Sequence, residues 1–252
     1  MRDRSLRRRY GVVALVASAT LAAACSDGFE LPLPSTTSTV PTLVPSTTVT
    51  AVGTPLVVVE QGLVSFPDPY DRGQSLGGYG VILENPNPGL VAAGIHVTTR
   101  ILDAAGTELL VDNALLNGIM PGHRMAVGRT LVEAVAGPTQ LAITVEVAAW
   151  LPPAAGVGEL VATEAITEPE LGGGAVTRFA VRSESTAGED GVDVAALYRA
   201  PDGRLLAVET TSVDQLPAGQ VVVGLIRLLA PIPGVATTEV LVGRGLSAQI
   251  TG

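Results

Sequence analysis

The sequence predicts an all-β chain with two tandem antiparallel β-sandwiches, and three observations support this prediction. The 252 residues include 29 Gly and 18 Pro and are only 15% charged, a composition suited to short strands and tight turns. In several segments apolar and polar residues alternate, which is the period of a half-buried strand. The stretch Gly94–Gly128 also recurs as Gly191–Gly224, and in both copies a second Gly follows twelve positions after the first. A repeat of this length predicts two domains of the same build.

The first domain is predicted to span residues 54–151. In Ile95–Leu102 the period of two places Ile95, Val97, Thr99 and Ile101 on one face of a strand. Pro67–Gly78 is expected to be a loop, and Asp103–Thr107 a hairpin turn. The strands expected here are Leu56–Val59 and Leu63–Phe66 (separated by a break at Gly62), Tyr79–Asn85, Ile95–Leu102, Leu109–Val111, Leu115–Ile119, Met125–Leu131 and Leu141–Trp150. No segment has a clear helical period, and at most Ala114–Ile119 and Val132–Ala136 could hold a helical turn.

The second domain is predicted to span residues 158–250, after a short linker at Pro152–Gly158. Turns are expected at Gly172–Gly174, Pro201–Gly203 and Pro217–Gly219. The expected strands are Leu160–Ile166, Phe179–Ser183, Val192–Arg199, Leu205–Thr210, Val221–Leu228 and Thr238–Gly243. With a single Cys the chain has no intramolecular disulfide, so both domains depend on apolar burial.

The first 24 residues have the pattern of a secretory signal peptide. Five arginines precede the apolar run Gly11–Ala24, which is shorter than the roughly 20 residues that a spanning helix needs. Ala22, Ala23 and Ala24 lead directly to Cys25, and this resembles the lipobox of bacterial lipoproteins, in which the cysteine is lipidated and becomes the mature N-terminus. The alternative is an ordinary cleaved signal with a cysteine nearby. The lipobox predicts a protein anchored to the outer face of a bacterial cell membrane through Cys25.

Residues 25–53 are predicted to be a linker. Thr, Ser and Pro dominate this segment and no periodic apolar face is present, so it cannot bury enough surface to offset its ordering entropy. We expect it to hold the folded part away from the membrane. Without residues 1–24 the chain has ten arginines against twenty-three acids, and a surface this acidic disfavours nucleic acid as a partner.

The order of turns and strands resembles a known family. In both domains a strand is followed by a polar turn, a hairpin whose turn contains Asp and Gly, and a Pro-Gly or Pro-Ala-Gly turn before the next strand. Arg100-Ile101-Leu102-Asp103 and Ala196-Leu197-Tyr198-Arg199 are similar to the motif of FxLYD-type, immunoglobulin-like domains of bacterial envelope proteins. The resemblance implies two immunoglobulin-like sandwiches over roughly residues 56–151 and 158–245. It implies no catalytic residues.

The residues that carry chemistry are sparse. His96 is expected on the polar face of a strand and His123 in a turn, where counting from Pro121 and Pro217 aligns His123 with Gly219. Zinc needs three or four closely spaced ligands, and a serine nucleophile needs a base and an orienting group. Neither set is visible, so we predict no enzyme and no cofactor. Trp150, Tyr79 and Phe179 are expected in the core, which disfavours a sugar-binding platform.

Calcium is the one metal for which candidate ligands exist. Asp68 and Asp71 are expected to share one loop. Glu184, Glu189, Asp190 and Asp193 are expected to share another, and Glu189 and Asp190 are the best candidates. Neither group has the spacing of an EF-hand, and solvated loop charge is the preferred interpretation.

Two functions remain from the sequence. The first is a non-catalytic envelope protein that presents two sandwiches to a protein partner or acts as a spacer, with an exposed sheet edge or the loops Pro67–Gly78 and Thr186–Val192 as its contact surface. The second is a ligand- or calcium-binding accessory lipoprotein of the cell envelope.

Overall fold

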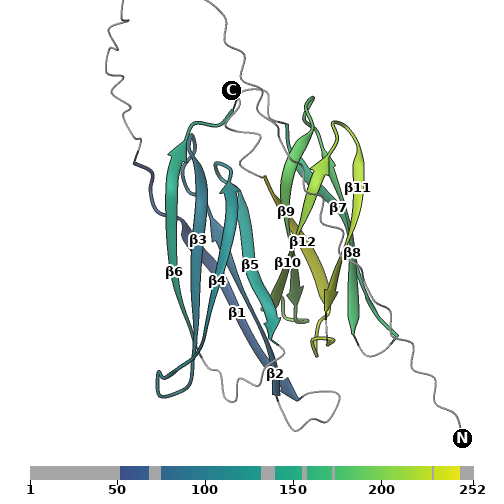
Figure 1. Ribbon diagram of the computed structural model, residues 1–252. Coiled ribbons are helices and arrows are strands. Elements are labelled where there is room, and N and C mark those ends of the chain that lie inside the picture. The colour runs from purple at the N-terminus through teal and green to yellow at the C-terminus, as the bar shows by residue number, and fades with distance from the viewer. Residues whose placement is uncertain are drawn as a thin grey trace, which may run out of the picture. The chain divides into compact units, whose positions relative to one another are not determined.

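A computed structural model describes residues 52–67, 75–131, 140–154, 158–171, 174–228 and 230–244, all within one compact unit. The predicted all-β fold is confirmed, because these residues form twelve strands (Figure 1). They include no helix, and therefore none long and apolar enough to cross a membrane. The strands are β1 (Val57–Pro67), β2 (Ser75–Glu84), β3 (Val91–Leu102), β4 (Glu108–Ile119), β5 (Arg124–Leu131), β6 (Gln140–Leu151), β7 (Leu160–Pro169), β8 (Ala175–Ser183), β9 (Glu189–Arg199), β10 (Leu205–Leu216), β11 (Val221–Leu228) and β12 (Thr237–Gly243).

The strands form four antiparallel three-stranded sheets. Sheet I has the order β1-β2-β5, and sheet II has the order β4-β3-β6. Sheet III has the order β10-β9-β12, and sheet IV has the order β11-β8-β7. Sheets I and II form the first sandwich and sheets III and IV the second. In each sandwich the chain crosses from one sheet to the other after its second, fourth and fifth strands. The same crossings occur in an immunoglobulin-like sandwich in which one sheet contains strands A, B and E and the other contains strands C′, C and F.

The two sandwiches correspond strand by strand. β4 and β10 begin and end 97 positions apart, and so do β5 and β11. The same offset relates the glycines with positive φ, since Gly94, Gly106 and Gly122 correspond to Gly191, Gly203 and Gly219. The strand registers follow it as well: Ile95 pairs with Leu116, and Val192 pairs with Val213. Residues at this offset therefore occupy the same place in the two sandwiches.

The turn before β5 aligns differently from the sequence prediction. His123 N donates to the carbonyl of Met120 in the first sandwich, and Gln220 N donates to the carbonyl of Pro217 in the second. The glycine at the third position of each turn, Gly122 or Gly219, has positive φ. His123 therefore corresponds to Gln220, and its predicted alignment with Gly219 is wrong. The positive φ at the third position of the turn, which glycine tolerates best, sets the correspondence rather than the proline.

Most predicted strands are confirmed, but several are longer than predicted, among them β8, β9 and β10. β1 continues through Gly62 without a break, and β2 begins at Ser75, inside the expected loop Pro67–Gly78. Ala114–Ile119, one of the two segments that could hold a helical turn, is part of β4. Val132–Ala136 lies outside the described residues. The predicted faces of β3 are confirmed, because Ile95, Val97, Thr99 and Ile101 are all buried.

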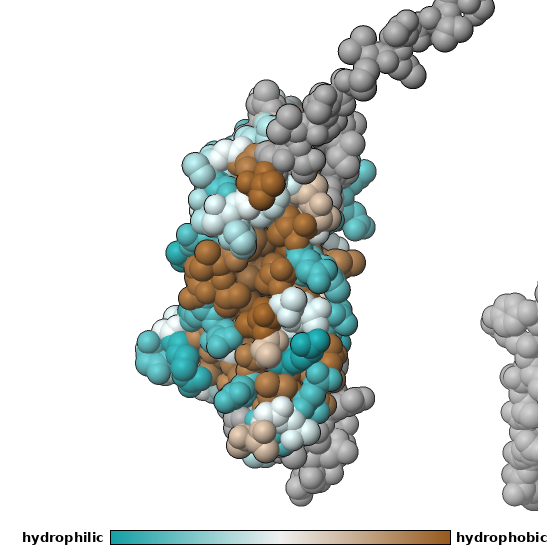
Figure 2. Space-filling model, turned by 90° about the vertical axis from the view of Figure 1, so that its left-hand side faces the viewer, coloured by the Kyte–Doolittle hydropathy of each residue, from teal (hydrophilic) through white to brown (hydrophobic). Residues whose placement is uncertain are grey.

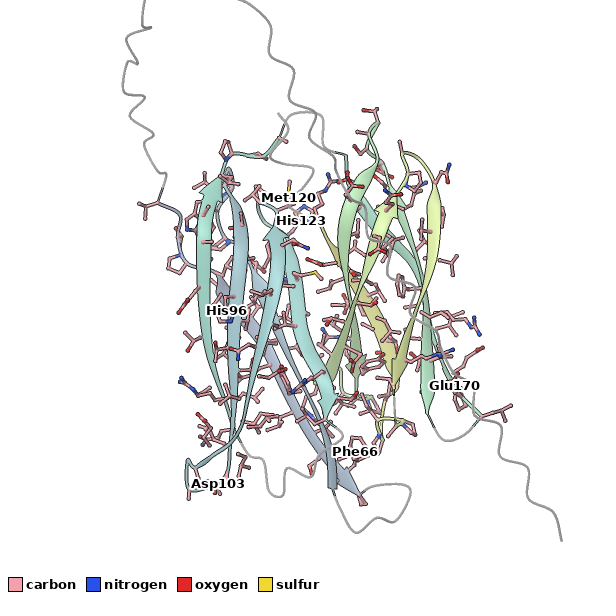
Figure 3. The ribbon with its side chains drawn as sticks, viewed as in Figure 1. Phe66, His96, Asp103, Met120, His123 and Glu170 are labelled. Atoms are coloured by element: carbon pink, nitrogen blue, oxygen red, sulfur yellow. The ribbon has the colours of Figure 1, made fainter. Side chains whose placement is uncertain are left out.

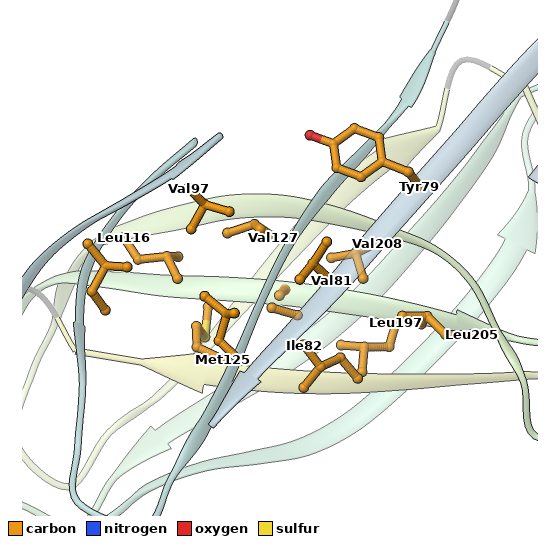
Figure 4. Close-up of a cluster of buried hydrophobic side chains, with 14 of the residues drawn as sticks. Tyr79, Val81, Ile82, Val97, Leu116, Met125, Val127, Leu197, Leu205 and Val208 are labelled. Atoms are coloured by element: carbon orange, nitrogen blue, oxygen red, sulfur yellow. The ribbon is translucent and has the colours of Figure 1, made fainter. Parts of the chain in front are cut away.

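The apolar core of the first sandwich continues into the second. Tyr79, Val81, Val97 and Leu116 belong to the same cluster of buried side chains as Leu197 and three other residues of sheet III (Figure 4). The members from sheet III are Ala195, Leu197, Leu205 and Val208. A second cluster lies between sheets III and IV and includes Phe179, Val194 and Tyr198. Sheet I is thus covered on one face by sheet II and on the other by sheet III.

Glycines let β10 approach sheet I closely. A Cβ atom added at Gly80 would lie 2.5 Å from Val208 Cγ2, and one added at Gly78 would lie 2.8 Å from the Cβ of Ala207. A Cβ at Gly62 would collide with the backbone carbonyl of Leu205. Because these glycines of β1 and β2 have no side chain, β10 can pack directly against the backbone of sheet I. The two sandwiches therefore form one packed body.

Polar contacts at the same interface hold the sandwiches in register. Glu60 of β1 accepts hydrogen bonds from Arg199 Nη1 at 2.8 Å and from Leu205 N at 3.1 Å. The bond to Glu60 raises the pKa of the Arg199 guanidinium above its usual value. Glu209 accepts hydrogen bonds from the backbone N and the hydroxyl of Thr130, both at 2.8 Å, and burial raises the pKa of its carboxyl. The interface combines apolar contact with partly buried charge.

Candidate functional site: the inter-sandwich cleft and the outer sheet faces

Part of the predicted chemistry falls outside the described residues. The predicted signal peptide (residues 1–24), Cys25, Asp68 and Asp71 are all in this part of the chain. The predictions that rest on them stay predictions. The expected contact loop Thr186–Val192 is described, and most of it is strand, since β9 begins at Glu189.

The predicted calcium candidates do not form a loop cluster. Glu189, Asp190 and Asp193 all lie in β9, because this strand begins earlier than the sequence pattern indicated. Asp193 accepts hydrogen bonds from the backbone N of Asn117 at 3.1 Å and from its side chain at 3.0 Å, and burial raises the pKa of this carboxyl. Among the described residues, no three His, Cys, Asp or Glu side chains are grouped so that they could hold a metal ion.

Glu189 forms a buried ion pair, so the prediction of a solvated loop charge is wrong for this residue. Its side chain and that of Arg244 are 3% and 4% exposed, and Arg244 Nη1 lies 2.9 Å from Glu189 Oε1. Arg244 also donates from Nη2 to the carbonyl of Gly158. The contact at Nη1 lacks hydrogen-bond geometry, and Glu189 Oε2 has no hydrogen-bond partner among the described residues. Removing either partner would leave the other charge buried and uncompensated.

Arg244 lines a cleft between the two sandwiches. The cleft has a volume of about 280 Å³. The first sandwich contributes the end of β4 and the turn into β5, and the second contributes the start of β7 and the end of β12. An adjoining cavity of about 500 Å³ shares His123, Arg124 and Glu159 with it. Arg124 is paired with Glu84 at 2.6 Å, so the charges of both arginines here are balanced by carboxylates.

The two histidines are far apart in the fold. His96 lies in the middle strand of sheet II and is half-buried, and His123 is exposed in the turn after Met120 (Figure 3). The predictions of a polar strand face for His96 and of a turn for His123 are confirmed. In the first sandwich they belong to separate elements, β3 and the turn before β5, and they do not combine into one site.

The outer face of sheet II carries apolar side chains on an edge strand. Leu109, Val111 and Leu115 alternate along β4 with inward-facing residues, and Leu115 is 79% exposed. Figure 2 shows the side of the molecule on which sheet II lies, and apolar side chains gather over its middle. Among the described strands β4 pairs with β3 alone, so its other backbone edge is open to solvent or to a partner.

The sheets stack in the order II, I, III, IV, and sheet IV presents a similar stripe at the other end of this stack. Val221, Val223 and Leu225 are exposed on β11, which is also an edge strand, and Val223 is 70% exposed. Arg178 and Arg182 of the neighbouring strand pair with Leu225 and Val221 across the ladder. Each end of the stack thus has an exposed apolar row on an edge strand. Periodicity in the sequence did not single out these rows, because valine and leucine in alternation predict a buried face.

The predicted core aromatics are buried or nearly so. Tyr79 and Phe179 are 1% and 2% exposed, and Trp150 is partly buried against the first core cluster. Tyr79 donates to Asp112, and burial raises the pKa of its hydroxyl. The described aromatic side chains therefore offer no exposed platform for a sugar ring.

Comparison with known proteins adds little to these features. No family model and no curated protein matches the chain. One solved structure with partial similarity is the crystal structure of Amycolatopsis orientalis exo-chitosanase CsxA, which is 14% identical with a TM-score of 0.28. The match covers 66% of this chain and 24% of that one, so the chain spans about a quarter of the length of that protein. The class that the structure itself defines is an all-β protein of two packed β-sandwiches.

Proposed function

We propose that this is a non-catalytic, lipid-anchored protein of the bacterial cell envelope that contacts a protein partner through the outer faces of its sandwiches. The observation that carries the contact proposal is the exposed apolar row on an edge strand at each end of the stack. Large apolar side chains exposed together on a regular strand are typical of protein interfaces. Because the sandwiches share a packed interface, the two rows are held apart at a constant separation, which also suits a spacer.

Lipidation at Cys25 is tested by one substitution. Cys25→Ser removes the thiol that would carry the lipid, so we expect the protein to move from the membrane pellet to the soluble fraction of the cell. Fractionation followed by immunoblotting measures this shift, and wild-type protein should remain with membranes under the same conditions. A Cys25→Ser protein that still sediments with membranes would disprove the anchor.

The contact faces are tested by placing a charge on each row. We expect Leu115→Asp and Val223→Asp to abolish specific crosslinks to envelope proteins, because an aspartate in an apolar interface loses hydration without gaining a partner. Crosslinking on intact cells followed by mass spectrometry measures the loss. Thr210→Asp is the matched control, since Thr210 is an exposed strand residue outside both rows. Crosslinks that persist equally in all three variants would refute contact through these faces.

The calcium-binding alternative now has less support. Glu189, one of the two best candidates, is committed to Arg244. An organic ligand would not use these carboxylates, because the pocket suited to it lies elsewhere in the second sandwich, between β7 and β12.

A further inference from the structure

The second sandwich contains a pocket between its two open edges. It lies where β7 of sheet IV faces β12 of sheet III and has a volume of about 540 Å³. This volume is within the range of roughly 300–1,000 Å³ that is usual for small-molecule sites. Most of the wall is apolar and comes from β7, the end of β11 and the segment before β12: Ala165, Ile166, Leu228, Pro231, Ile232 and Val235.

Four hydroxyl groups form a chain from this pocket into the core. Thr238 Oγ1 lies 2.8 Å from Thr167 Oγ1, which lies 2.8 Å from Thr177 Oγ1. Thr177 Oγ1 in turn lies 2.9 Å from the hydroxyl of Tyr198. Thr167 and Thr238 line the pocket and are partly exposed, whereas Thr177 and Tyr198 are fully buried. Four hydroxyls have four hydrogens to donate, and the chain uses three of them.

Burial decides which end keeps the fourth hydrogen. If Tyr198 only accepted, its own hydrogen would be buried without an acceptor, which is unfavourable. The favoured direction is therefore Tyr198 to Thr177, Thr177 to Thr167, and Thr167 to Thr238. Burial also raises the pKa of Tyr198 to about 12, so the phenol keeps its proton at neutral pH. The hydrogen left over therefore belongs to Thr238, which lines the pocket, so it is available to a ligand there.

The first sandwich shows that the fold does not require this chain of hydroxyl groups. The residues at the equivalent positions, from the offset and from the strand registers, are Leu63, Tyr79, Ile101 and Leu141. Three of them are apolar and pack with the first core cluster. The hydroxyl of Tyr79 donates to Asp112 instead. The polar chain is thus a feature of the second sandwich alone.

We propose that this pocket binds an uncharged, mainly apolar molecule through one hydrogen-bond acceptor, which Thr238 recognises. Apolar walls favour an apolar body, and a single outward hydroxyl hydrogen favours a carbonyl or ether oxygen. Glu168 is the only charged residue of the described lining, and it lies 3.7 Å from Arg178. A carboxylate ligand would therefore meet no compensating cation. This site depends neither on the anchor at Cys25 nor on the outer sheet faces.

The test uses cyclohexanone as the probe and the methyl resonances of the full chain as the readout. We expect saturable shifts at Thr167 and Thr238 and near them. Thr238→Val keeps the shape of the side chain and covers the Thr167 hydroxyl with a methyl group, so we expect affinity to fall about five- to tenfold. Thr238→Ser keeps the hydroxyl and should bind as the wild type does. Thermal unfolding of each variant confirms that it is folded.

Three results would overturn the proposal. The first is the absence of saturable shifts up to the solubility of the ketone, which would mean that the pocket holds water only. The second is equal affinity of the wild type and Thr238→Val, which would remove the role of the hydroxyl chain. The third is hexanoate binding as tightly as cyclohexanone, because the site lacks a cation to compensate a carboxylate.

Discussion

Arg244→Met should lower the free energy of unfolding by about 3–5 kcal/mol, the usual cost of breaking a buried ion pair. Glu189 is 3% exposed and would keep its charge without a counter-ion, so the folded state would have to bury an unpaired carboxylate or protonate it. The variant would also lose the bond from Arg244 to the carbonyl of Gly158. Chemical denaturation at neutral pH measures the change.

Two controls separate charge from packing. The double variant Glu189→Met with Arg244→Met removes both charges and retains apolar volume, so we expect it to recover most of the lost stability. Arg204→Met removes an arginine whose partner Asp202 lies 3.9 Å away with both side chains more than half exposed, and it should change stability by less than about 1 kcal/mol. If the double variant is as unstable as the single one, the loss comes from packing or from the Gly158 contact, and the unpaired buried charge is not its cause.

The fold class could be predicted because its signals are local. The alternation in Ile95–Leu102 reports a strand with one buried face, and the structure confirms that face. The hairpin turn at Asp103–Thr107 is likewise present, with Asp103 N donating to the carbonyl of Thr107 and Gly106 N to that of Asp103. These features depend on a few neighbouring residues, so the sequence contains them in full.

The buried ion pair and the pocket could not be predicted because they depend on distant residues. Glu189 and Arg244 are 55 positions apart in the chain, and only the pairing of β9 with β12 brings them together. The hydroxyl chain joins four different strands, of which each contributes one residue of ordinary strand character. A comparison of the two copies would have offered one signal, since Tyr198 and Thr238 stand where Ile101 and Leu141 stand in the first copy.

The errors at Gly62 and at Gly77-Gly78 have a different cause. A glycine in a sequence usually indicates a break or a turn, because it contributes no side chain to a sheet and loses the most entropy on folding. Here these glycines lie within β1 and β2. Gly62 and Gly78 make room for β10. These glycines are needed because β10, more than 100 residues later in the chain, packs against them. A local sequence pattern cannot predict such a distant contact.

This role of glycine leads to the second large effect, at Gly80. We expect Gly80→Val to destabilise the protein by about 1–3 kcal/mol or more, the usual cost of overpacking a core, because its Cβ alone would lie 2.5 Å from Val208 Cγ2 and 3.0 Å from the Val208 backbone N. Scanning calorimetry measures the loss, at roughly 2–4 °C in Tm for each kcal/mol in a protein of this size. Gly89→Ala is the matched control, since a Cβ there meets no atom within 4 Å, and its Tm should stay close to that of the wild type. If Gly80→Val melted with the wild-type protein, β10 would have to lie farther from sheet I, and the close packing of the two sandwiches at this point would be disproved.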